Sequence, residues 1–476
     1  MHKAQGIKKH DKYAVLLAGG QGSRFWPQSR ILEPKQFISL YKKTNLFEQS
    51  LKRIRRLIPS RNILISSSEL YRTQILEYAR IFNIPRPNLI FEPEGKNTAP
   101  SIGVAARLIH LRDPQARVCM LPCDHLIQNE GQFLKIIDKA LNICGDNLVI
   151  FGIPPYRAAT GYGYIKVTKP QSQGVRSKGL YSVDKFCEKP NLKRAQRFLK
   201  AGGYFWNSGI FAGAADTFLR EIGKHLPELH RKLENIHVNS DITRDWKAIK
   251  SISFDYGVME KTRSLLMLKV AKIGWLDLGS WQAWDEIIPK DKEGNAFKGD
   301  IISLDSRNIT ALSQNRLIAA IGLENLIVID TPDALLITKK ERSEDVKKIV
   351  DILKANKRQE HYLHLTVHRP WGHYTVLNKG QDFKIKLVEV KPHRSLSLQL
   401  HKKRSEHWII VEGRAKIIRG GKSYCVNSNE STFIPVSCVH RLINPDDTVL
   451  RLVEVQSGRY LEEDDIIRLK DDFERI

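Results

Sequence analysis

The feature that most constrains the fold is an alternation of short apolar runs with helical patterns between Tyr13 and about Lys290. YAVLLA, NILISS, LIFE, VCML and LVIFGI each have the length of a buried strand. The helical patterns between them span about 45–57, 69–82, 99–112 and 132–143. This alternation is typical of βαβ units that feed a largely parallel sheet. We therefore predict a doubly wound α/β domain over residues 13–290.

The pattern changes at about Glu293, where short apolar strands broken by turns continue to Lys340. Ser343 then begins a helix whose apolar positions, Val346, Ile349, Val350 and Leu353, have helical spacing. The following stretch, ANKRQEHYLHL, is typical of a linker. Residues 291–360 are therefore predicted to form a short β segment, a helix and a linker.

Residues 361–476 form a third region with dense alternating strands and no convincing helix before the tail. Runs such as FKIKLVEV, HWIIVEG and LRLVEV are typical of an antiparallel sandwich or barrel. Eight of the fifteen histidines lie beyond residue 360, which directs the search for a metal site to this region.

The net charge of +25 favours anionic partners such as nucleic acid, a membrane surface or phosphorylated small molecules. Basic residues are spread along the whole chain without a nucleic-acid module, and the densest run, Lys52–Arg56, is interpreted as a solvated helix face. No apolar stretch is long enough for a membrane span. Six scattered cysteines without a CxxC pair favour a reducing, cytoplasmic setting.

A glycine-rich loop follows the first predicted strand, where an α/β sheet places its ligands. It is neither a P-loop nor a dinucleotide fingerprint. Glycines allow backbone N–H groups to approach a phosphate, and an arginine and a lysine add charge for its oxygens. The predicted phosphate-binding residues are Gly19, Gly20, Gly22, Ser23, Arg24 and Lys35.

Further motifs follow in order: EPEGKNTAP from Glu92, PCDH from Pro122, TGYGY from Thr160, EKP from Glu188, WNSG from Trp206 and GWLDLGSW from Gly274. Together with the loop they resemble the sugar-1-phosphate nucleotidylyltransferases over roughly residues 13–290. PKQF, KNTAP and DLGSW resemble the mannose-1-phosphate guanylyltransferase branch. Ser23 stands where this family usually has Thr, and Cys123 where Ser is common.

This resemblance implies that mannose 1-phosphate attacks the α-phosphorus of GTP, giving GDP-mannose and pyrophosphate. It implies that Asp124 and Asp277 hold Mg²⁺, and that Arg24 and Lys35 act in catalysis on the triphosphate. The implied substrate-binding residues are Gly161, Glu188, Lys189 and Asn207, with Lys189 on the sugar phosphate. The preference for guanine and for mannose rests on the resemblance alone, so another nucleotide or sugar stays open.

A second constellation, Q-x-H-x4-E-x6-G and P-x4-H-x3-N, begins at Gln399. It offers two imidazoles, a carboxylate and an amide oxygen, a set that suits Zn²⁺ with open positions. The spacing resembles the two cupin metal motifs, and RPWGHY with LSLQLHKKRSEHW resembles the type II mannose-6-phosphate isomerases that occur fused behind this guanylyltransferase. The predicted metal ligands are Gln399, His401, Glu406 and His440.

By this second resemblance the metal, Zn²⁺ or another divalent ion, would polarise the substrate oxygens during proton transfer between C1 and C2. Arg404 is the expected partner of the phosphate or enediolate. The general base stays open among Lys386, Glu406 and His407. His393 and Ser437 stand where cupins usually have glycine, and Arg414 stands where this family commonly has Thr; all three lie close to the predicted isomerase site in the sequence.

We therefore predict a bifunctional cytoplasmic enzyme, with a doubly wound nucleotidyltransferase domain, a short β segment and an all-β cupin barrel. Its expected substrates are GTP, mannose 1-phosphate and mannose 6-phosphate, and the family implies a role in bacterial surface polysaccharide synthesis. A homo-oligomer is left open, and neither nucleic acid nor a membrane is expected as a partner. One alternative is a monofunctional transferase with a silent metal-binding cupin, and another, suggested only by charge, is a nucleic-acid-binding protein.

Overall fold

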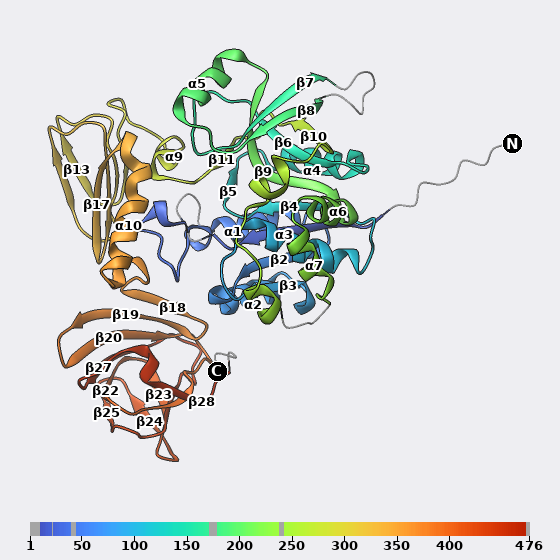
Figure 1. The fold of residues 1–476 in the computed structure, drawn as a ribbon. Coiled ribbons are helices and arrows are strands. Elements are labelled where there is room, and N and C mark those ends of the chain that lie inside the picture. The colour runs from blue at the N-terminus through green and yellow to red at the C-terminus, as the bar shows by residue number, and fades with distance from the viewer. Residues whose placement is uncertain (1–9, 21, 40–43, 171–178, 238–241, 473–476) are drawn as a thin grey trace.

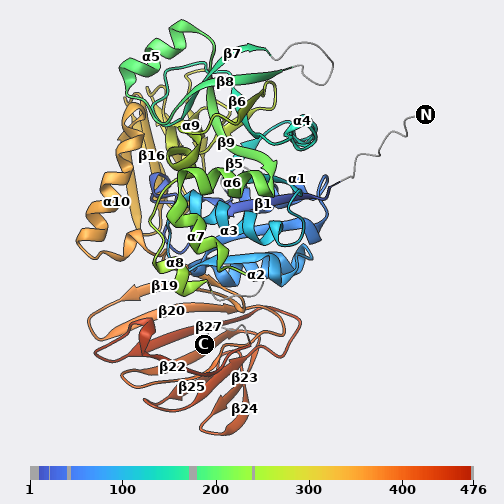
Figure 2. The same cartoon turned by 45° about the vertical axis from the view of Figure 1, so that its right-hand side comes forward.

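The structure, a computed structural model, describes residues 10–20, 22–39, 44–170, 179–237 and 242–472. It contains an α/β domain, a small β stack and a C-terminal barrel (Figure 1). The barrel packs below the α/β domain next to α2 in both views, and α10 runs along the β stack (Figure 2). In the described part of the chain, helices are too short or too polar to cross a membrane.

A nine-stranded sheet in the order β3-β2-β1-β4-β9-β6-β10-β8-β7 forms the centre of the first domain. Its strands are β1 (Lys12–Ala18), β2 (Ile63–Ser68), β3 (Leu89–Glu92), β4 (Arg117–Pro122), β6 (Leu148–Ile153), β7 (Tyr164–Pro170), β8 (Leu180–Cys187), β9 (Tyr204–Ala214) and β10 (Leu265–Lys269). A separate pair joins β5 (His125–Ile127) to β11 (Trp275–Asp277).

Helices cover both faces of this sheet, as a doubly wound fold requires. The helices of this domain are α1 (Leu46–Ile54), α2 (Arg72–Ile81), α3 (Thr98–His110), α4 (Glu130–Ile143), α5 (Leu192–Ala201), α6 (Ala215–His225), α7 (Pro227–Glu234) and α8 (Thr243–Lys247). The short α9 (Trp281–Asp285) packs instead against the β stack. Successive residues of β1 point to opposite faces. Leu16 therefore belongs to the core with α1, α2 and α4, and Val15 to the core with α3, α6 and α7.

The prediction of a largely parallel sheet is correct for only part of it. The β3-β2-β1-β4 half and the β6–β10 pair are parallel. β9 runs antiparallel to β4, β6 and β7, and β8 is antiparallel to β7 and β10. Only nine residues separate β7 from β8 in the sequence, fewer than the dozen or more that a parallel crossover needs, so these strands pair antiparallel.

The predicted β segment is a stack of short strands with a helix on its side. β12 (Ala296–Lys298), β14 (Thr310–Leu312) and β16 (Leu326–Thr331) pair in parallel, as do β13 (Ile301–Leu304) and β15 (Ile318–Ile321), and β17 (Ala334–Lys339) closes antiparallel on β16. α10 (Val346–Ala355) buries Val346 and Val350, in agreement with its predicted periodicity.

The stretch predicted as a linker connects α10 to the barrel, and it is docked on the first domain. The N–H groups of Ile31 and Leu32 donate to the carbonyls of His361 and Tyr362 at 3.1 and 2.9 Å. Trp26 Nε1 donates to the Glu360 carbonyl at 2.8 Å. These contacts tie the entry to the barrel to the segment that follows the glycine-rich loop.

The barrel consists of two antiparallel sheets, in agreement with the prediction of a cupin. One has the order β18-β19-β20-β27-β22-β25 and the other β24-β23-β26-β21-β28. The strands are β18 (Thr366–Arg369), β19 (Gly372–Lys379), β20 (Phe383–Val390), β21 (Leu398–His401), β22 (Ser405–Glu412), β23 (Arg414–Arg419), β24 (Lys422–Asn427), β25 (Ser431–Ile434), β26 (His440–Ile443), β27 (Leu450–Ser457) and β28 (Ile466–Lys470).

The basic run on α1 is only partly a solvated face. Lys52, Arg55 and Arg56 are exposed as predicted, whereas Arg53 is buried. Its guanidinium lies 3.5 Å from Glu130 and 5.6 Å from the centre of the Phe133 ring. Arg53 therefore holds α1 against α4 and is not part of a charged surface.

Candidate active sites in the two domains

The glycine-rich loop fits closely around Lys35. Gly22 has φ +61°, and a Cβ there would lie 2.8 Å from the Cβ and Cγ of Lys35, so a side chain is excluded by conformation and by space. Beneath the loop, Gln36 Nε2 donates to the carbonyls of Ala18 and Gly20 at 3.1 and 3.0 Å. The loop is thus shaped by the PKQF motif that follows it.

Lys35 joins the two predicted metal-binding acids. Its Nζ lies 2.8 Å from Asp124 Oδ2 and 3.2 Å from Asp277 Oδ1, and it donates to the Leu278 carbonyl at 3.0 Å. Asp124 immediately precedes β5 and Asp277 ends β11, and these strands pair with Asp277 opposite His125. The structure therefore brings together two acids that are 153 positions apart in the chain.

The charges of this cluster stabilise one another. Burial alone would lower the pKa of Lys35, but the attraction of Asp124 and Asp277 outweighs it and raises the pKa. Burial would raise the pKa of Asp124, but the Lys35 ammonium lowers it to about 2. Asp124 therefore stays ionised at neutral pH. Both acids retain about a quarter to a third of their side-chain exposure. This cluster offers two carboxylates side by side, and carboxylate oxygens are the ligands that a hard divalent ion such as Mg²⁺ prefers.

A cleft of about 690 Å³ opens beside this cluster. The predicted residues that line it are Gly20, Gly22, Ser23, Arg24, Lys35, Asp124, Gly161, Lys189 and Asp277. The structure does not place Gly19 among the residues that line the cleft, and a Cβ at Gly19 would be 3.5 Å from a carboxylate oxygen of Glu92. Arg24 forms an ion pair with Glu344 at 2.8 Å in this structure, so it must leave Glu344 to reach a phosphate.

Glu188 and Asn207 form a second group next to Gly163. A Cβ at Gly163 would lie 2.5 Å from Glu188 Oε2 and 3.3 Å from Asn207 Cβ. Glu188 Oε1 lies 3.1 Å from Lys189 Nζ, whereas its Oε2 is buried without a hydrogen-bond partner in the described structure. A buried acceptor without a donor is costly, and a sugar hydroxyl is a donor that would satisfy it.

The sequence analysis missed Asp255, which receives a hydrogen bond of 2.8 Å from Asn207 Nδ2. Burial, followed by the charge of Glu188, raises the pKa of Asp255 to about 7. Asp255 lies in a helical turn between the WNSG and GWLDLGSW motifs and belongs to neither of them. No signal in the sequence therefore identifies it.

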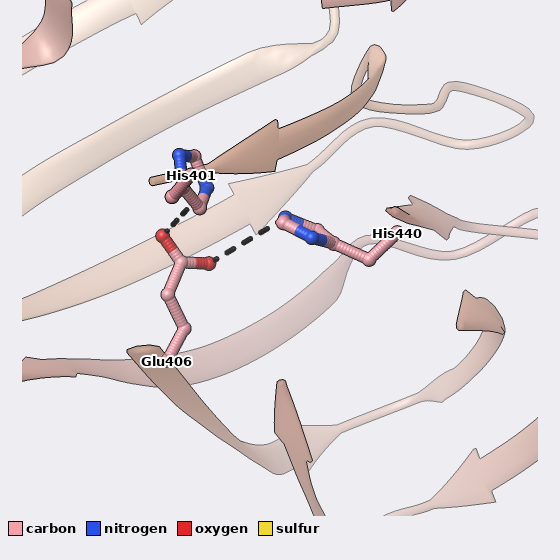
Figure 3. A group of neighbouring side chains, drawn as sticks. All are labelled: His401, Glu406 and His440. Atoms are coloured by element: carbon pink, nitrogen blue, oxygen red, sulfur yellow. Dashed lines mark ion pairs between the residues drawn. The ribbon is translucent and has the colours of Figure 1, made fainter. Parts of the chain in front are cut away.

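In the barrel, three of the predicted metal ligands converge in a buried group (Figure 3). His401 Nε2 lies 3.1 Å from Glu406 Oε1, and His440 Nε2 lies 3.9 Å from Glu406 Oε2. Each of the three comes from a different strand: β21, β22 and β26. Gln399 shares a face of β21 with His401 and pairs with His440 across β26, so the amide belongs to the same group.

The nitrogens of this group fit a metal. His440 Nδ1 lies 2.9 Å from the Cys438 carbonyl, which holds the proton on Nδ1 and leaves the Nε2 lone pair free. In the described structure, His440 Nε2 and both ring nitrogens of His401 are buried without a hydrogen-bond partner. Two imidazoles and a carboxylate are the donor set of a divalent cupin metal.

Arg404, predicted as a phosphate partner, is almost fully buried and positions Glu406. Its Nε donates to Glu406 Oε1 at 3.1 Å and its Nη1 to the Glu462 carbonyl at 3.0 Å. Trp408 Nε1 donates to the other oxygen of Glu406 at 3.1 Å. These donors lock the carboxylate toward the histidines.

Of the candidate bases, His407 and Lys386 are poorly placed. His407 points to the outer face of β22, where it contacts Ser431 Oγ at 3.0 Å. Lys386 Nζ lies 2.9 Å from Glu463, and although burial opposes it, the attraction of Glu463 and Glu454 raises the pKa of Lys386. Lys386 is therefore held protonated and cannot accept a proton.

Glu454, which the sequence analysis missed, is buried in the same cavity as Gln399 and Glu406. Burial, followed by the charge of Glu406, raises the pKa of Glu454 to about 7. Gln456 Nε2 donates to Glu454 at 2.7 Å and to Glu406 at 3.2 Å. The inward positions of β27 change from leucine to these two polar residues, and that change was the available signal in the sequence.

Comparisons with protein families agree with this division of the chain. Residues 13–294 match the family described as "Nucleotidyl transferase", and residues 299–353 match "MannoseP isomerase/GMP-like beta-helix domain". Residues 356–471 match "Mannose-6-phosphate isomerase C-terminal".

Several curated proteins are similar over nearly the whole chain. A protein named mannose-1-phosphate guanylyltransferase 2, from Escherichia coli O157:H7, is 40% identical over 96% of this chain and 97% of its own. Alginate biosynthesis protein AlgA from Pseudomonas aeruginosa is 38% identical over 97% of each chain. Xanthan biosynthesis protein XanB from Xanthomonas campestris is 38% identical over 98% of this chain and 99% of its own.

Among solved structures, one from Thermus thermophilus, named mannose-1-phosphate geranyltransferase, is 28% identical with a TM-score of 0.66. It covers 72% of this chain and 99% of its own.

Asp255 generates a prediction on stability. The pKa of Asp255 in the folded state, about 7, lies above its ordinary value of 3.8. Below about pH 4 the group is protonated in both states and does not lower the free energy of unfolding. As pH rises from about 4 to about 7, the free energy of unfolding falls, because only the unfolded state can readily release the proton. Asp255→Asn removes this loss, which amounts to at most about 4 kcal/mol above pH 7. We expect the thermal midpoint of the variant to exceed that of wild type by several degrees more at pH 8 than at pH 5.

The matched control is Asp184→Asn, which changes a surface acid paired with Lys166. A difference between Asp255→Asn and wild type that does not change from pH 5 to pH 8 would contradict the assigned pKa.

Proposed function

The chain belongs to the family of mannose-1-phosphate guanylyltransferases fused to type II mannose-6-phosphate isomerases, and from this we propose that it carries out both reactions. One forms GDP-mannose and pyrophosphate from GTP and mannose 1-phosphate. The other interconverts mannose 6-phosphate and fructose 6-phosphate. The observation that carries the first assignment is the meeting of Asp124 and Asp277 at Lys35, beside a cleft lined by the glycine-rich loop.

In the guanylyl transfer, a phosphate oxygen of mannose 1-phosphate attacks the α-phosphorus of GTP, and the bond to the leaving pyrophosphate breaks. The protein contributes position and charge, because this chemistry requires little else. Lys35 and Arg24 would neutralise the triphosphate, and the open Oε2 of Glu188 would accept a hydroxyl of the sugar. Asp124 and Asp277 would hold Mg²⁺, which supplies further positive charge to the phosphate oxygens.

In the isomerisation, a proton moves between C2 and C1 of the open-chain sugar through an enediol. His401, Glu406, His440 and Gln399 would hold the divalent metal, which supplies polarisation of the substrate oxygens. Glu454 is suited to move the proton, since it is a buried carboxyl group that lines the same cavity as Gln399 and Glu406.

The two reactions supply GDP-mannose for polysaccharide synthesis, which accords with relatives named for alginate and xanthan biosynthesis. All six cysteines are free, and four of them are buried, as suits a reducing cytoplasm.

The assignment of substrates is tested with a panel of GTP, ATP, UTP and CTP against mannose 1-phosphate and glucose 1-phosphate. We expect GTP with mannose 1-phosphate to give the highest kcat/KM, measured by release of pyrophosphate. A clear preference for another pair of nucleotide and sugar 1-phosphate would contradict this assignment and indicate a different branch of the nucleotidylyltransferases.

The metal-binding acids are tested by Asp124→Asn and Asp277→Asn. Each variant loses one ionised ligand, and we expect the guanylyltransferase kcat to fall about a hundredfold or more. Asp184→Asn serves as the matched control. Isomerase activity of the acid variants should remain at the wild-type level, because their cluster lies outside the barrel. Full transferase activity in both variants would exclude the proposed magnesium site.

The barrel metal is tested by His401→Ala, with His393→Asn as the control because His393 is an exposed residue with positive φ, which Asn tolerates. We expect His401→Ala to lose bound metal, measured by elemental analysis, and to lose mannose 6-phosphate turnover while retaining guanylyl transfer. Wild-type protein that binds the metal but does not turn over mannose 6-phosphate would support the alternative of a silent cupin.

A further inference from the structure

One cavity lies at the boundary between the first domain and the barrel, and a second, inside the barrel, shares two lining residues with it. The first, which we call the junction cavity, has a volume of about 270 Å³. Leu32, Glu33 and Thr73 of the first domain line one wall, and the β18 region and Lys391 of the barrel line the other. The second, which we call the metal-facing cavity, lies in the barrel and includes Gln399, Glu406 and Glu454.

The metal-facing cavity is too small for a whole sugar phosphate. Its volume of about 50 Å³ has room for only a few water molecules, given that one needs about 10–15 Å³ on the same measure. A hexose phosphate is several times larger. Only the end of the sugar that reacts can enter it, and the phosphate must lie elsewhere.

Arg369 and Arg468 line both cavities, so they mark where the cavities adjoin. Arg369 ends β18, the first strand of the barrel, and its guanidinium lies 5.9 Å from the centre of the Tyr374 ring. Across the ranges that the structure describes, no carboxylate lies within ion-pair distance of Arg369. Its planar fork of donors is thus open to a phosphate, for which arginine is well suited.

The junction cavity also has the charge that an anion requires. Arg369, Lys391 and Arg468 face two carboxyl groups, Glu33 and Glu77. Burial raises the pKa of Glu33 to about 7, so a substantial part of this group is neutral at physiological pH. Three histidines, His364, His368 and His373, complete the polar lining.

We propose that the junction cavity binds the phosphate of mannose 6-phosphate through Arg369 and Arg468, while C1 and C2 of the sugar enter the metal-facing cavity. This inference rests on the proposed isomerase function and assigns its phosphate site to the boundary between domains. It also makes the first domain part of that site, since α2 and the Leu32 segment close its outer wall.

The test measures binding by titration calorimetry in the metal-loaded full-length protein, with mannose 6-phosphate, inorganic phosphate and mannose as probes. We expect Arg369→Gln to weaken mannose 6-phosphate and phosphate about tenfold or more and to leave mannose unchanged. The KM for mannose 6-phosphate should rise by a similar factor, with a smaller change in kcat. The control is Arg419→Gln, which lines neither cavity, and unchanged guanylyl transfer verifies that both variants are folded.

A second variant tests the wall that the first domain contributes. Thr73→Trp adds a large side chain from α2 to the junction cavity, and we expect it to raise the KM for mannose 6-phosphate at least about fivefold, a smaller effect than loss of a charged hydrogen bond. Arg80→Trp, at an exposed position of the same helix, is the matched control and should leave KM unchanged.

The outcomes separate this inference from the proposed function. Turnover of mannose 6-phosphate with an unchanged KM in both Arg369→Gln and Thr73→Trp overturns the phosphate site and leaves the isomerase standing. If the wild type binds mannose 6-phosphate in a way that depends on Arg369 but does not turn it over, the phosphate site is supported and the isomerase function is contradicted. Absence of binding in wild type overturns both.

Discussion

The buried ammonium of Lys35 is the interaction on which the first domain depends. A lysine in this position is stable only with partners, because an unpaired buried charge costs far more than a paired one. Asp124 and Asp277 supply those partners from the ends of two paired strands, and the Leu278 carbonyl supplies a third. The same arrangement holds two carboxylates close together, which electrostatic repulsion would otherwise oppose. Stability of the loop and readiness for a divalent ion thus have one physical origin.

The interior of the barrel is apolar at one end of the strands and polar at the other. On β20 and β27, Val390 pairs with Leu450 at one end, whereas Lys386 pairs with Glu454 toward the other. β22 continues the same gradient, with Ile410 opposite Leu452 and Glu406 opposite Gln456. Every second residue of a strand points into the barrel. Where these inward residues change from apolar to polar at the same level on neighbouring paired strands, one end of the barrel interior becomes polar. The apolar end supplies the hydrophobic burial that can offset the cost of this polar group.

The sequence predicted those features that depend on local periodicity or on a spaced motif. The helices at 46–54 and 346–355 and the convergence of His401, Glu406 and His440 are of this kind. The mixed sheet, the burial of Arg53 and the docking of residues 359–362 depend on which elements become neighbours, and periodicity carries no information on that. Glu454 lies between these cases. Its inward position was readable from the pattern of β27, whereas its raised pKa comes first from burial and then from the charge of Glu406, and both depend on the folded barrel.

One short segment of the first domain connects the two sites. Residues 26–33 follow the glycine-rich loop directly, and Ser29 Oγ donates to the Gly22 carbonyl at 2.7 Å. The other end of the segment is hydrogen-bonded to His361 and Tyr362 and reaches the junction cavity at Leu32 and Glu33. Buried Arg30 fixes the middle through an ion pair of 2.9 Å with Asp333 of the β stack. The three parts of the chain therefore meet on a single segment. This gives a structural reason for the two proposed activities to share one chain: the segment that is hydrogen-bonded to the nucleotide loop also forms a wall beside the barrel.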